Sequence, residues 1–382
     1  MKAIQVTKYV SGPQDLFVTT LPTPSPHPTK YLIKIRACGT NFFDLLQIQG
    51  KYQHQPPLPW IAGMEFAGVV VATPTTREGS KSAVASSLDG TVSTQTDHQF
   101  KVGDRVFGAT HGAYSSHILA SEDSLFPVPH GWSFADAAGV YVTTPTAYGA
   151  LVVRANVQPG EWVLVHAGAG GVGLSAVQIA KALGATVVAT AGSERKRQVC
   201  LDYGADYVVD YRDKSWPQRV IGLCEQHRTG NGKKGVDVVY DPVGKCSRLS
   251  THRAPSNKLA IGMIDPSIKC IAWNGRLLVI GFAGGSIEKV AMNRVLLKNI
   301  SIVGLHWGAY SQHERETIPK VWKGIFDLIN SGKLKGITYT DKHYKGLEEV
   351  PQALIALGAR DTWGKVVVEL DEHYGEEGRS KL

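Results

Sequence analysis

One stretch of the chain, residues 162–196, constrains its fold more than any other. It begins with a short apolar run, WVLVH, that is typical of a strand buried on both faces of a sheet. Gly168, Gly170 and Gly173 follow with the spacing G-x-G-x-x-G, and apolar residues then recur at helical spacing before a second strand-like run, Thr186–Thr190. A glycine loop between a strand and a helix, with a second strand behind, predicts a dinucleotide-binding βαβ unit.

Each glycine has its own expected role in such a loop. The first, Gly168, allows the tight turn after the strand, and the second, Gly170, lets the backbone approach a pyrophosphate group. The third, Gly173, lets the following helix pack closely on the strand. Three glycines at this spacing also occur in ordinary turns, so the prediction depends on the strand and the helix around them.

The residues after the second strand indicate which dinucleotide binds. NAD sites usually carry Asp or Glu about 20 residues after the loop, where the carboxylate holds the ribose hydroxyls. Here no carboxylate follows the strand before Ser193, and the cationic Arg195 and Lys196 come soon after. A hydroxyl and two cations suit the 2′-phosphate of NADP, which a carboxylate would repel. Glu194 is the exception, because it would favour NAD if it turned inward, whereas an exposed Glu is common at the start of a helix.

The composition is that of a soluble globular protein with room for two domains. The chain has 382 residues, of which 43% are hydrophobic and 19% charged, and no apolar run approaches the ~20 residues of a membrane helix. The formal net charge of +8 is spread along the chain without a long basic run. This distribution favours solubility and a local attraction for an anionic cofactor over nucleic-acid binding.

The cysteines predict free thiols in a reducing compartment. Their number is odd, they are widely scattered, and none forms a C-x-x-C pair, so we expect neither a disulfide framework nor a structural zinc site. The five are Cys38, Cys200, Cys224, Cys246 and Cys270.

The two ends of the chain bear on its location. The strand-like start MKAIQV resembles neither a secretory signal nor an Arg-rich transit peptide. The last three residues, Ser380-Lys381-Leu382, match the address that the peroxisomal import receptor reads. We therefore expect a peroxisomal protein, or a cytoplasmic one if this polar tail is only a disordered end.

Segments of different character divide the chain. A β-rich start is interrupted at residues 73–98, whose Ser, Thr, Gly and Asp cannot build a core and predict a mobile insertion. Alternating strands and helices then predict a parallel sheet, interrupted by a polar, proline-containing insertion at 246–269. A helix at Ile318–Asn330 and a strand at Lys365–Leu370 follow. The expected domains are 1–143 (β-rich), 144–306 (dinucleotide-binding), 307–370 (a return to the first domain) and 371–382 (a flexible tail).

Short motifs in a fixed order carry a family resemblance over most of the chain, leaving out the two insertions and the tail. In this order and spacing, the chain resembles the quinone oxidoreductase (zeta-crystallin-like) branch of the medium-chain dehydrogenase/reductase superfamily. Besides the glycine loop, the motifs are ACGTNFFDLLQIQG (37–50), GMEFAG (63–68), VGDRV (102–106), TPTAY (144–148), DPVG (241–244), NGRLLVIG (274–281) and GKVVV (364–368).

The resemblance implies an α/β fold of two domains. A GroES-like, β-rich catalytic domain would be built from both chain ends, and a Rossmann domain with a doubly wound parallel sheet would be inserted between them. The active site would lie in the cleft between the domains. Such proteins are usually homodimers or homotetramers joined through the cofactor domain, and we expect the same here.

The resemblance also implies chemistry without a metal. Zinc-dependent relatives carry a catalytic Cys near the position of Asn41, a His where Met64 stands, and a four-Cys lobe in the region of residues 73–98, which has no cysteine here. Without thiolate and imidazole ligands we expect no tetrahedral zinc site and no zinc-bound alcohol. Lone histidines such as His166 are more often hydrogen-bonded in a core than metal ligands.

The reaction that the resemblance implies is direct hydride transfer from NADPH to a quinone or another electron-poor α,β-unsaturated carbonyl, a small-molecule electron acceptor. Asn41 and Tyr52 match polar groups beside the nicotinamide, Asn41 as an amide donor and Tyr52 as a phenol donor with a proton to give. Each has an alternative use. Asn41 would suit the N-cap of a helix at Phe42–Gln49, and Tyr52 would suit packing in a proline-containing loop.

The expected cofactor contacts follow from the glycine loop, the cations after it and the resemblance. The residues expected at the nicotinamide end are Thr146, Gly281, Phe282 and Ala283. Those expected at the pyrophosphate are Gly168, Gly170, Gly171, Val172 and Gly173. Those expected at the adenosine 2′-phosphate are Ser193, Arg195, Lys196 and Tyr211. The alternatives are ordinary turns for the glycines and core packing for Phe282.

Two other functions stay open at this point. A related branch of 2-enoyl-thioester reductases shares the fold and also uses a Tyr in the pocket, and fatty acyl-thioesters would suit a peroxisomal enzyme. Some zeta-crystallin-like proteins bind nucleic acid or have structural roles. The net charge of +8 permits this, but no basic motif with interleaved aromatic residues supports it.

Overall fold

The computed structural model describes residues 1–75, 98–228, 234–246 and 261–374. They form two compact units: the described residues within Met1–Tyr141 and Thr338–Leu382 make up unit 1, and those within Val142–Ile337 make up unit 2. Most of the insertion predicted at 73–98 and the terminal Ser380-Lys381-Leu382 lie outside the described residues. Among the described residues, no helix has both the length and the apolar character needed to cross a membrane.

Unit 1 is built around a seven-stranded sheet with the order β19-β20-β4-β6-β7-β9, in which β8 also pairs with β4. The pairs are antiparallel except for β19 with β20. The strands of unit 1 are β1 (Lys2–Ala3), β2 (Gln5–Val6), β3 (Thr19–Thr20), β4 (Tyr31–Gly39), β5 (Trp60–Ile61), β6 (Glu65–Ala72), β7 (Arg105–Ala109), β8 (His117–Ala120), β9 (Leu125–Pro127), β19 (Tyr344–Lys345) and β20 (Val367–Glu369).

The core of unit 1 follows from the alternation of side chains along its strands. Tyr31, Ile33 and Ile35 point to one face of β4, because successive side chains of a strand point to opposite faces. They join Phe66 of β6 and Val106 of β7 in one buried cluster. The helices of unit 1 are η1 (Pro13–Asp15), α1 (Phe42–Ile48), η2 (Glu122–Ser124), α2 (Phe134–Ala138), η5 (Leu347–Glu349) and α11 (Val350–Ala359).

Unit 2 contains a six-stranded sheet with the order β12-β11-β10-β13-β16-β18, and every pair in it is parallel. This is the doubly wound order in which the first strand, β10, lies in the middle, and it confirms the predicted parallel sheet. The strands of unit 2 are β10 (Trp162–Val165), β11 (Thr186–Thr190), β12 (Tyr207–Val209), β13 (Val236–Asp241), β14 (Lys245–Cys246), β15 (Ile261–Gly262), β16 (Ile271–Val279), β17 (Gly285–Ser286) and β18 (Ser301–Gly304).

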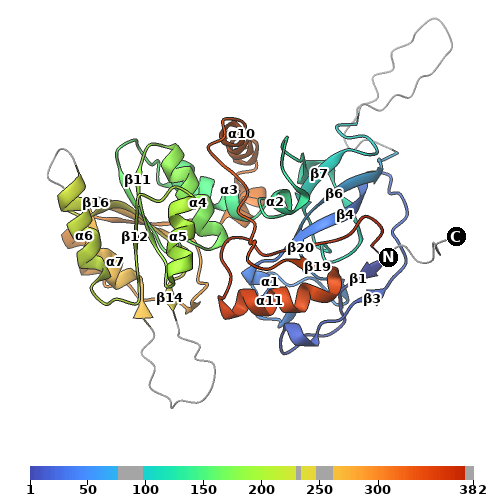
Figure 1. Ribbon diagram of the computed structural model, residues 1–382, viewed down its shortest axis with the longest axis horizontal. Helices are drawn as coiled ribbons and strands as arrows, with labels where there is room; N and C mark the ends of the chain where they lie inside the picture. The colour runs from blue at the N-terminus through green and yellow to red at the C-terminus, as the bar shows by residue number, and fades with distance from the viewer. Residues whose placement is uncertain (76–97, 229–233, 247–260, 375–382) are drawn as a thin grey trace, which may run out of the picture. The chain divides into compact units, whose positions relative to one another are not determined.

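Helices cover both faces of this parallel sheet (Figure 1). On one face, α6 and α7 contribute Trp216, Val220, Ile264 and Ile268 to a buried cluster with strand residues such as Leu164. The helical segments of unit 2 are α3 (Thr143–Tyr148), the π-helix η3 (Gly149–Arg154), α4 (Gly171–Ala182), α5 (Glu194–Asp202), α6 (Trp216–His227), α7 (Ile264–Cys270), α8 (Met292–Lys298), η4 (Trp307–Ala309), α9 (Tyr310–His313) and α10 (Thr317–Asn330).

Two sequence-based boundaries need correction. The insertion predicted at 246–269 is shorter at its end, because helix α7 packs Ile264 and Ile268 into the core of unit 2. Pro266 is tolerated there because it lies in the first turn, where the N–H groups of a helix have no partner within the helix. A proline within a polar segment usually indicates a loop, which is why the sequence pattern predicted an insertion up to residue 269.

The second correction concerns residues 307–337, which the sequence analysis assigned to the catalytic domain. They belong to unit 2. The amide of Gln178 in α4 donates to the carbonyl of Lys335 at 3.2 Å and accepts from its N–H at 2.9 Å. The hydroxyl of Tyr203 donates to the carbonyl of Gly336 at 3.0 Å. These bonds hold the segment after α10 to the dinucleotide-binding fold.

The cysteines agree with the expectation of free thiols. Each of the four whose side chains the structure describes is free and buried. They are Cys38, Cys200, Cys224 and Cys270.

Candidate functional site

The glycine loop joins β10 to α4 in unit 2, where the sequence predicted it. The positive φ of its turn, 47°, lies at Ala167 and not at Gly168. Gly168 therefore does not allow the tight turn through a positive φ. Gly168 is needed for space, because a Cβ there would lie 2.7 Å from the Cβ of Ala189 on the neighbouring strand.

Gly173 has the predicted role of close packing between helix and loop. A Cβ at this position would lie 2.2 Å from the carbonyl oxygen of Ala167 and 2.8 Å from that of Gly168, and backbone atoms cannot move aside cheaply. At Gly170, the N-cap of α4, a Cβ would have a single neighbour within 4 Å among the described residues, the Ala167 carbonyl oxygen at 3.3 Å. The other sides of this backbone position are open to a ligand.

The first turn of α4 consists of Gly171, Val172 and Gly173. The N–H groups at the first positions of a helix have no carbonyl partner within it, and together with the helix dipole they attract anions. This α4 terminus, reached over a loop of small residues, can hold a pyrophosphate group.

The segment after β11 forms the start of α5. Ser193 is its N-cap, and the Ser193 hydroxyl oxygen accepts from the N–H of Lys196 at 3.3 Å. The bond uses the hydroxyl as an acceptor, so its hydrogen can be donated to a ligand. Glu194 is exposed in the first turn, as the helix-start alternative predicted, and Arg195 and Lys196 stand in the same turn.

Tyr211 comes from the neighbouring strand end, after β12. A Cβ at Gly192 would lie 3.0 Å from the Tyr211 phenol oxygen and 3.1 Å from its ring. The glycine therefore lets the Tyr211 ring lie directly against the backbone that leads into Ser193. The structure thus brings together Ser193, Lys196 and Tyr211, which the sequence assigned to one phosphate.

The residues expected at the nicotinamide end lie on α3 and after β16. The hydroxyl of Thr146 donates to the carbonyl of Val142 at 2.7 Å, so it can serve a ligand as an acceptor, for example of an amide N–H. The N–H of Ala283 is bonded to the carbonyl of Pro242 at 3.3 Å, which leaves Gly281 and Phe282 as the candidate backbone donors. The Phe282 side chain is 41% exposed, so the alternative that it packs in a core is wrong.

Asp241 orders the loop beside Ala283. Its carboxylate accepts from the N–H groups of Val243 and Gly244 at 2.8 and 3.0 Å. Burial raises the pKa of Asp241 to about 6, against the effect of these two bonds. The DPVG motif is therefore a structural turn that supports the segment after β16.

Asn41 lies at the start of α1 in unit 1, and its backbone and side chain have different partners. Asn41 and Asp44 form a capping box, in which the Asn41 N–H donates to the Asp44 carboxylate at 2.8 Å. The predicted N-cap position is confirmed. The side-chain Nδ2 of Asn41 also donates to Glu65 at 2.9 Å, and its Oδ1 accepts from Lys365 at 2.5 Å.

Lys365 and Glu65 form a fully buried ion pair that encloses this amide. A buried charge is tolerated when it is paired and hydrogen-bonded. The ammonium can only donate and the ionised carboxylate can only accept, so together they fix which end of the Asn41 amide is the oxygen and which is the nitrogen. The second hydrogen of Nδ2 is left for another acceptor.

Asp44 lies beside this group, almost fully buried. Its Oδ2 accepts from the Tyr114 hydroxyl at 2.6 Å as well as from the Asn41 N–H, whereas Oδ1 has no partner among the described residues. Burial raises the pKa of Asp44 to about 7. At neutral pH this carboxyl group is therefore partly protonated, with Oδ1 as the natural site of the proton.

Tyr52 follows α1 and is half-buried. Its ring stacks on Phe43 of α1, with 5.5 Å between the ring centroids and an angle of 27° between the planes. Burial raises the pKa of its phenol, and the nearby Asp44 raises it further, so the phenol stays protonated. The packing alternative thus describes its ring, while its hydroxyl keeps a proton.

Among the described residues, no group of three or more His, Cys, Asp or Glu side chains could hold a metal ion. His166 is fully buried in unit 2 between the hydroxyls of Thr190, at 3.2 Å, and Ser267, at 2.7 Å. Burial lowers the pKa of His166 to about 3, so the ring is neutral and acts as a hydrogen-bonding core residue.

The sequence analysis missed the polar cluster around Asn41. Glu65 lay in the GMEFAG motif and Lys365 in GKVVV, but neither motif announces that the two side chains meet. Asn41 and Lys365 are 324 residues apart in the sequence. A lone Lys at the start of an apolar terminal strand was the one signal, because a buried Lys needs a partner.

Both units match known family models. A model for the alcohol dehydrogenase GroES-like domain matches residues 27–130, which confirms the GroES-like assignment of unit 1. A model described as zinc-binding dehydrogenase matches residues 171–252. Among curated proteins, quinone oxidoreductase-like protein 2 of Mus musculus is 33% identical over 345 residues, which covers 90% of this chain and 85% of the mouse protein.

Solved structures are similar in fold over nearly the whole chain. The quinone oxidoreductase of Escherichia coli complexed with NADPH is 27% identical, with a TM-score of 0.75 over 97% of this chain and 100% of that one. The CurK enoyl reductase is 24% identical, with a TM-score of 0.74 over 97% of this chain and 99% of that one. The latter likeness shows a common fold alone.

Proposed function

Because this chain belongs to the quinone oxidoreductase-like branch of the medium-chain dehydrogenase/reductase superfamily, we propose that it is an NADPH-dependent oxidoreductase. Its substrate in this proposal is a quinone or another electron-poor α,β-unsaturated carbonyl. The bound dinucleotide supplies the hydride, and the protein binds it, orients it and stabilises charge on the acceptor.

One observation carries the cofactor assignment. The carboxyl ends of parallel strands meet at one edge of a sheet, and here the ends of β10, β11 and β12 bear the glycine loop, Ser193 with Lys196, and Tyr211. The α4 terminus would hold the pyrophosphate, while Ser193 and Lys196 would hold a 2′-phosphate. The NADPH complex of the Escherichia coli relative supports this assignment.

Asn41 and Tyr52 are the proposed groups at the acceptor. The second Nδ2 hydrogen of Asn41 and the phenol hydrogen of Tyr52 are donors that would stabilise negative charge as it develops on the acceptor oxygen. Tyr52 would also give up its proton to that oxygen. We propose chemistry without zinc, since Asn41 and Met64 stand where zinc ligands would be needed.

The experiment that tests the proposal is an acceptor screen followed through NADPH oxidation. We expect turnover with quinones and an NADPH affinity well above the NADH affinity. Lys196→Ala should lose NADPH affinity far more than NADH affinity, because NADPH carries a 2′-phosphate that this cation can pair with and NADH does not. Lys323→Ala, an exposed cation of α10 paired with Asp327, is the matched control and should change neither. Equal losses for the two cofactors at Lys196→Ala would contradict the 2′-phosphate assignment.

A 2-enoyl-thioester reductase is the second candidate, because the related branch of these enzymes shares the fold and also uses a Tyr in the pocket, as Tyr52 would be here. The same NADPH assay with an enoyl-CoA separates the two candidates. Turnover of the thioester alone would refute the quinone assignment.

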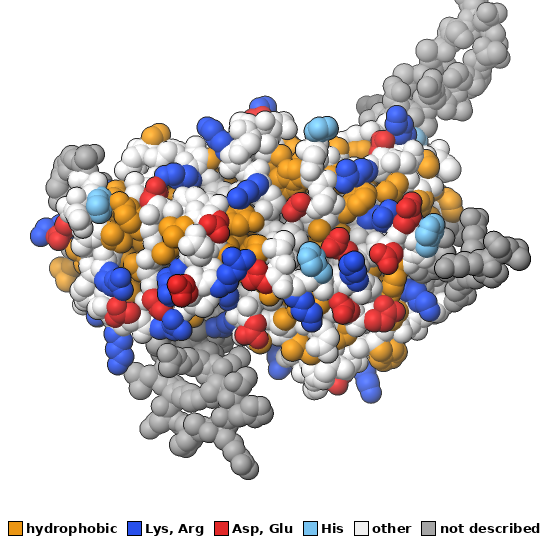
Figure 2. All heavy atoms as spheres, in the orientation of Figure 1, with side chains coloured by type: hydrophobic (Ala, Val, Ile, Leu, Met, Phe, Trp, Pro, Cys, Tyr) orange, Lys and Arg blue, Asp and Glu red, His pale blue; other side chains and the backbone are white. Residues whose placement is uncertain are grey.

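A nucleic-acid-binding or structural role that retains NADPH binding is the candidate from another class. On the face shown in Figure 2, basic and acidic side chains are interspersed, which suits a soluble surface. Protection from thermal unfolding by NADPH, together with no turnover of any acceptor, would favour this role.

We also propose a homodimer or homotetramer joined through unit 2. The supporting features are the edge strand β18, which ends the parallel sheet in the described part of the chain, and α8, whose Met292, Leu296 and Leu297 are 70%, 78% and 72% exposed. Exposed apolar patches of this kind mark interfaces. Peroxisomal import through Ser380-Lys381-Leu382 is a further proposal, and a fluorescent fusion with and without this tripeptide tests it.

A further inference from the structure

Asp210 is the first residue after β12 and lies beside the proposed 2′-phosphate site. β11 and β12 are parallel neighbours, and their last residues, Thr190 and Val209, are paired. The segments that follow, one beginning at Ala191 and the other at Asp210, therefore leave the sheet side by side. The first leads into α5, and the second carries Tyr211.

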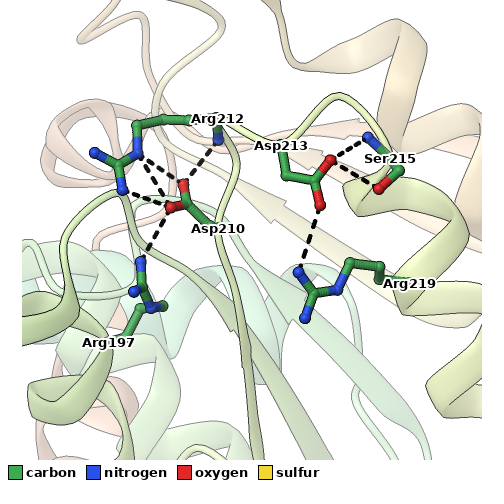
Figure 3. A network of polar contacts seen from close by, with 6 residues as sticks. All are labelled: Arg197, Asp210, Arg212, Asp213, Ser215 and Arg219. Carbon is green, nitrogen blue, oxygen red and sulfur yellow. Dashed lines mark hydrogen bonds and ion pairs between the residues drawn. The ribbon is translucent and has the colours of Figure 1, made fainter.

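The Asp210 carboxylate joins these two segments (Figure 3). Its oxygens accept from Arg212 of its own loop, from Nη2 at 2.6 Å, from Nε at 2.9 and 3.1 Å, and from the backbone N–H at 2.9 Å. One oxygen also accepts from Nη1 of Arg197 in α5 at 3.1 Å. One carboxylate thus closes its own turn and ties that turn to a neighbouring helix.

Both tied segments carry residues of the proposed phosphate site. Arg197 lies one turn after the N-cap Ser193, whose carbonyl accepts the Arg197 N–H at 2.9 Å. On the other side, Tyr211 stands between Asp210 and Arg212, so the closed turn fixes where its ring can lie, which is against Gly192. The Asp210 bonds therefore set the distance between the Tyr211 ring and the first turn of α5.

The negative charge of Asp210 repels a bound anion, whereas its hydrogen bonds support the site that binds the anion. Hydrogen bonding from Arg212 lowers the pKa of Asp210, so the group is an ionised carboxylate at neutral pH. A carboxylate near a phosphate weakens binding through repulsion, although the two arginines offset its charge. Charge alone predicts that removing it strengthens NADPH binding, whereas a positioning role predicts that removing it weakens the binding.

We propose that Asp210 is a positioning residue of the 2′-phosphate site, which holds Tyr211 and the first turn of α5 in the geometry that receives the phosphate. The inference rests on the NADPH preference proposed above and assigns to an acidic residue a role in binding an anion. Ligand-binding groups depend on neighbours that lock their position, so loosening this link should lower affinity.

The test measures the dissociation constants of NADPH and NADH by calorimetry on the full chain. In Asp210→Asn we expect NADPH to bind about tenfold more weakly, with NADH almost unchanged and kcat at saturating NADPH unchanged. The matched control is Asp213→Asn, which removes the same charge from the same loop. Asp213 accepts only from groups that follow it, Ser215 at 2.7 and 2.9 Å and Arg219 at 3.4 Å, among the contacts drawn in Figure 3. The control variant Asp213→Asn should therefore bind NADPH as tightly as the unsubstituted protein, or slightly more tightly.

A second variant keeps the inference testable if Asp210→Asn folds poorly. Arg197→Lys keeps the cation but loses the planar donor that reaches Asp210, so NADPH affinity should fall several-fold. Unchanged NADH affinity in the same variant would show that it is folded. Unchanged or tighter NADPH binding in Asp210→Asn would overturn the inference while leaving the proposed function intact. No preference for NADPH in the unsubstituted protein would overturn both.

Discussion

The raised pKa of Asp44 predicts that its carboxyl group makes unit 1 less stable at alkaline pH. Folding raises this pKa from 3.8 to about 7 through burial, and Oδ1 has no partner among the described residues. Between these two values, the folded chain holds one proton more than the unfolded chain. The free energy of unfolding therefore falls as pH rises through this window and levels off above about pH 7.

The substitution Asp44→Asn isolates this contribution. The amide has the shape of the protonated acid, its oxygen can accept from Tyr114 and from the Asn41 N–H, and its NH₂ takes the place of Oδ1. One pKa unit corresponds to about 1.4 kcal/mol, and two units separate pH 5 from the folded pKa, so the variant should gain about 3 kcal/mol relative to the parent between pH 5 and pH 8.

The measurement is urea unfolding of both proteins at pH 5 and pH 8, compared as a difference of differences. Other titrating groups, such as Asp241, are present in both proteins and cancel. Asp327→Asn removes an exposed carboxylate of α10 and serves as the control, with the same small effect at both pH values. If Asp44→Asn is equally destabilising at both pH values, or worse at pH 8, then Asp44 is an ionised acceptor in the fold and the reasoning is refuted.

Three other variants test the remaining structural arguments. Lys365→Met should destabilise the protein by about 3–5 kcal/mol in urea unfolding, since it leaves the buried Glu65 carboxylate without its cation. The double variant with Glu65→Gln should recover much of this loss, and no recovery would mean that the two side chains act separately. Gly173→Ala should abolish NADPH binding in calorimetry, because the new Cβ would meet the Ala167 carbonyl oxygen. In the control Gly222→Ala, the Cβ points into open space on α6, so this variant should gain up to about 1 kcal/mol in free energy of unfolding and bind NADPH normally. Leu296→Glu should reduce the oligomer mass seen by light scattering if α8 forms the interface, and an unchanged mass would place the interface elsewhere.

The dinucleotide-binding fold was predictable because its signals are local. A strand, a glycine loop, a helix and a second strand succeed one another within residues 162–190, and each has its own pattern in the sequence. The spacing also predicted the tight fit at Gly173. The spacing does not indicate the positive φ at Ala167, a residue type that ordinarily avoids this conformation.

The domain boundaries were less predictable because they depend on packing between distant segments. Residues 307–337 join unit 2 through bonds such as those of Gln178 with Lys335, which no periodicity reveals. Helix α7 was hidden by the polar segment before it and by Pro266, although its Ile264 and Ile268 have the spacing of a buried helical face.

The sequence analysis offered two interpretations of Asn41, a helix N-cap and an amide donor beside the nicotinamide, and the group around Asn41 shows that one residue can serve as both. An N-cap is defined by backbone position, and Asn41 holds it in a capping box with Asp44. A catalytic amide is defined by what its side chain can donate, and that depends on Glu65 of β6 and on Lys365, which lies just before β20. The cap fixes the backbone, the ion pair fixes the amide, and the two together leave one N–H of Nδ2 with a defined direction. If Asn41 acts on the acceptor as proposed, Glu65→Gln should therefore impair turnover by releasing that direction, even though Glu65 itself need not touch substrate.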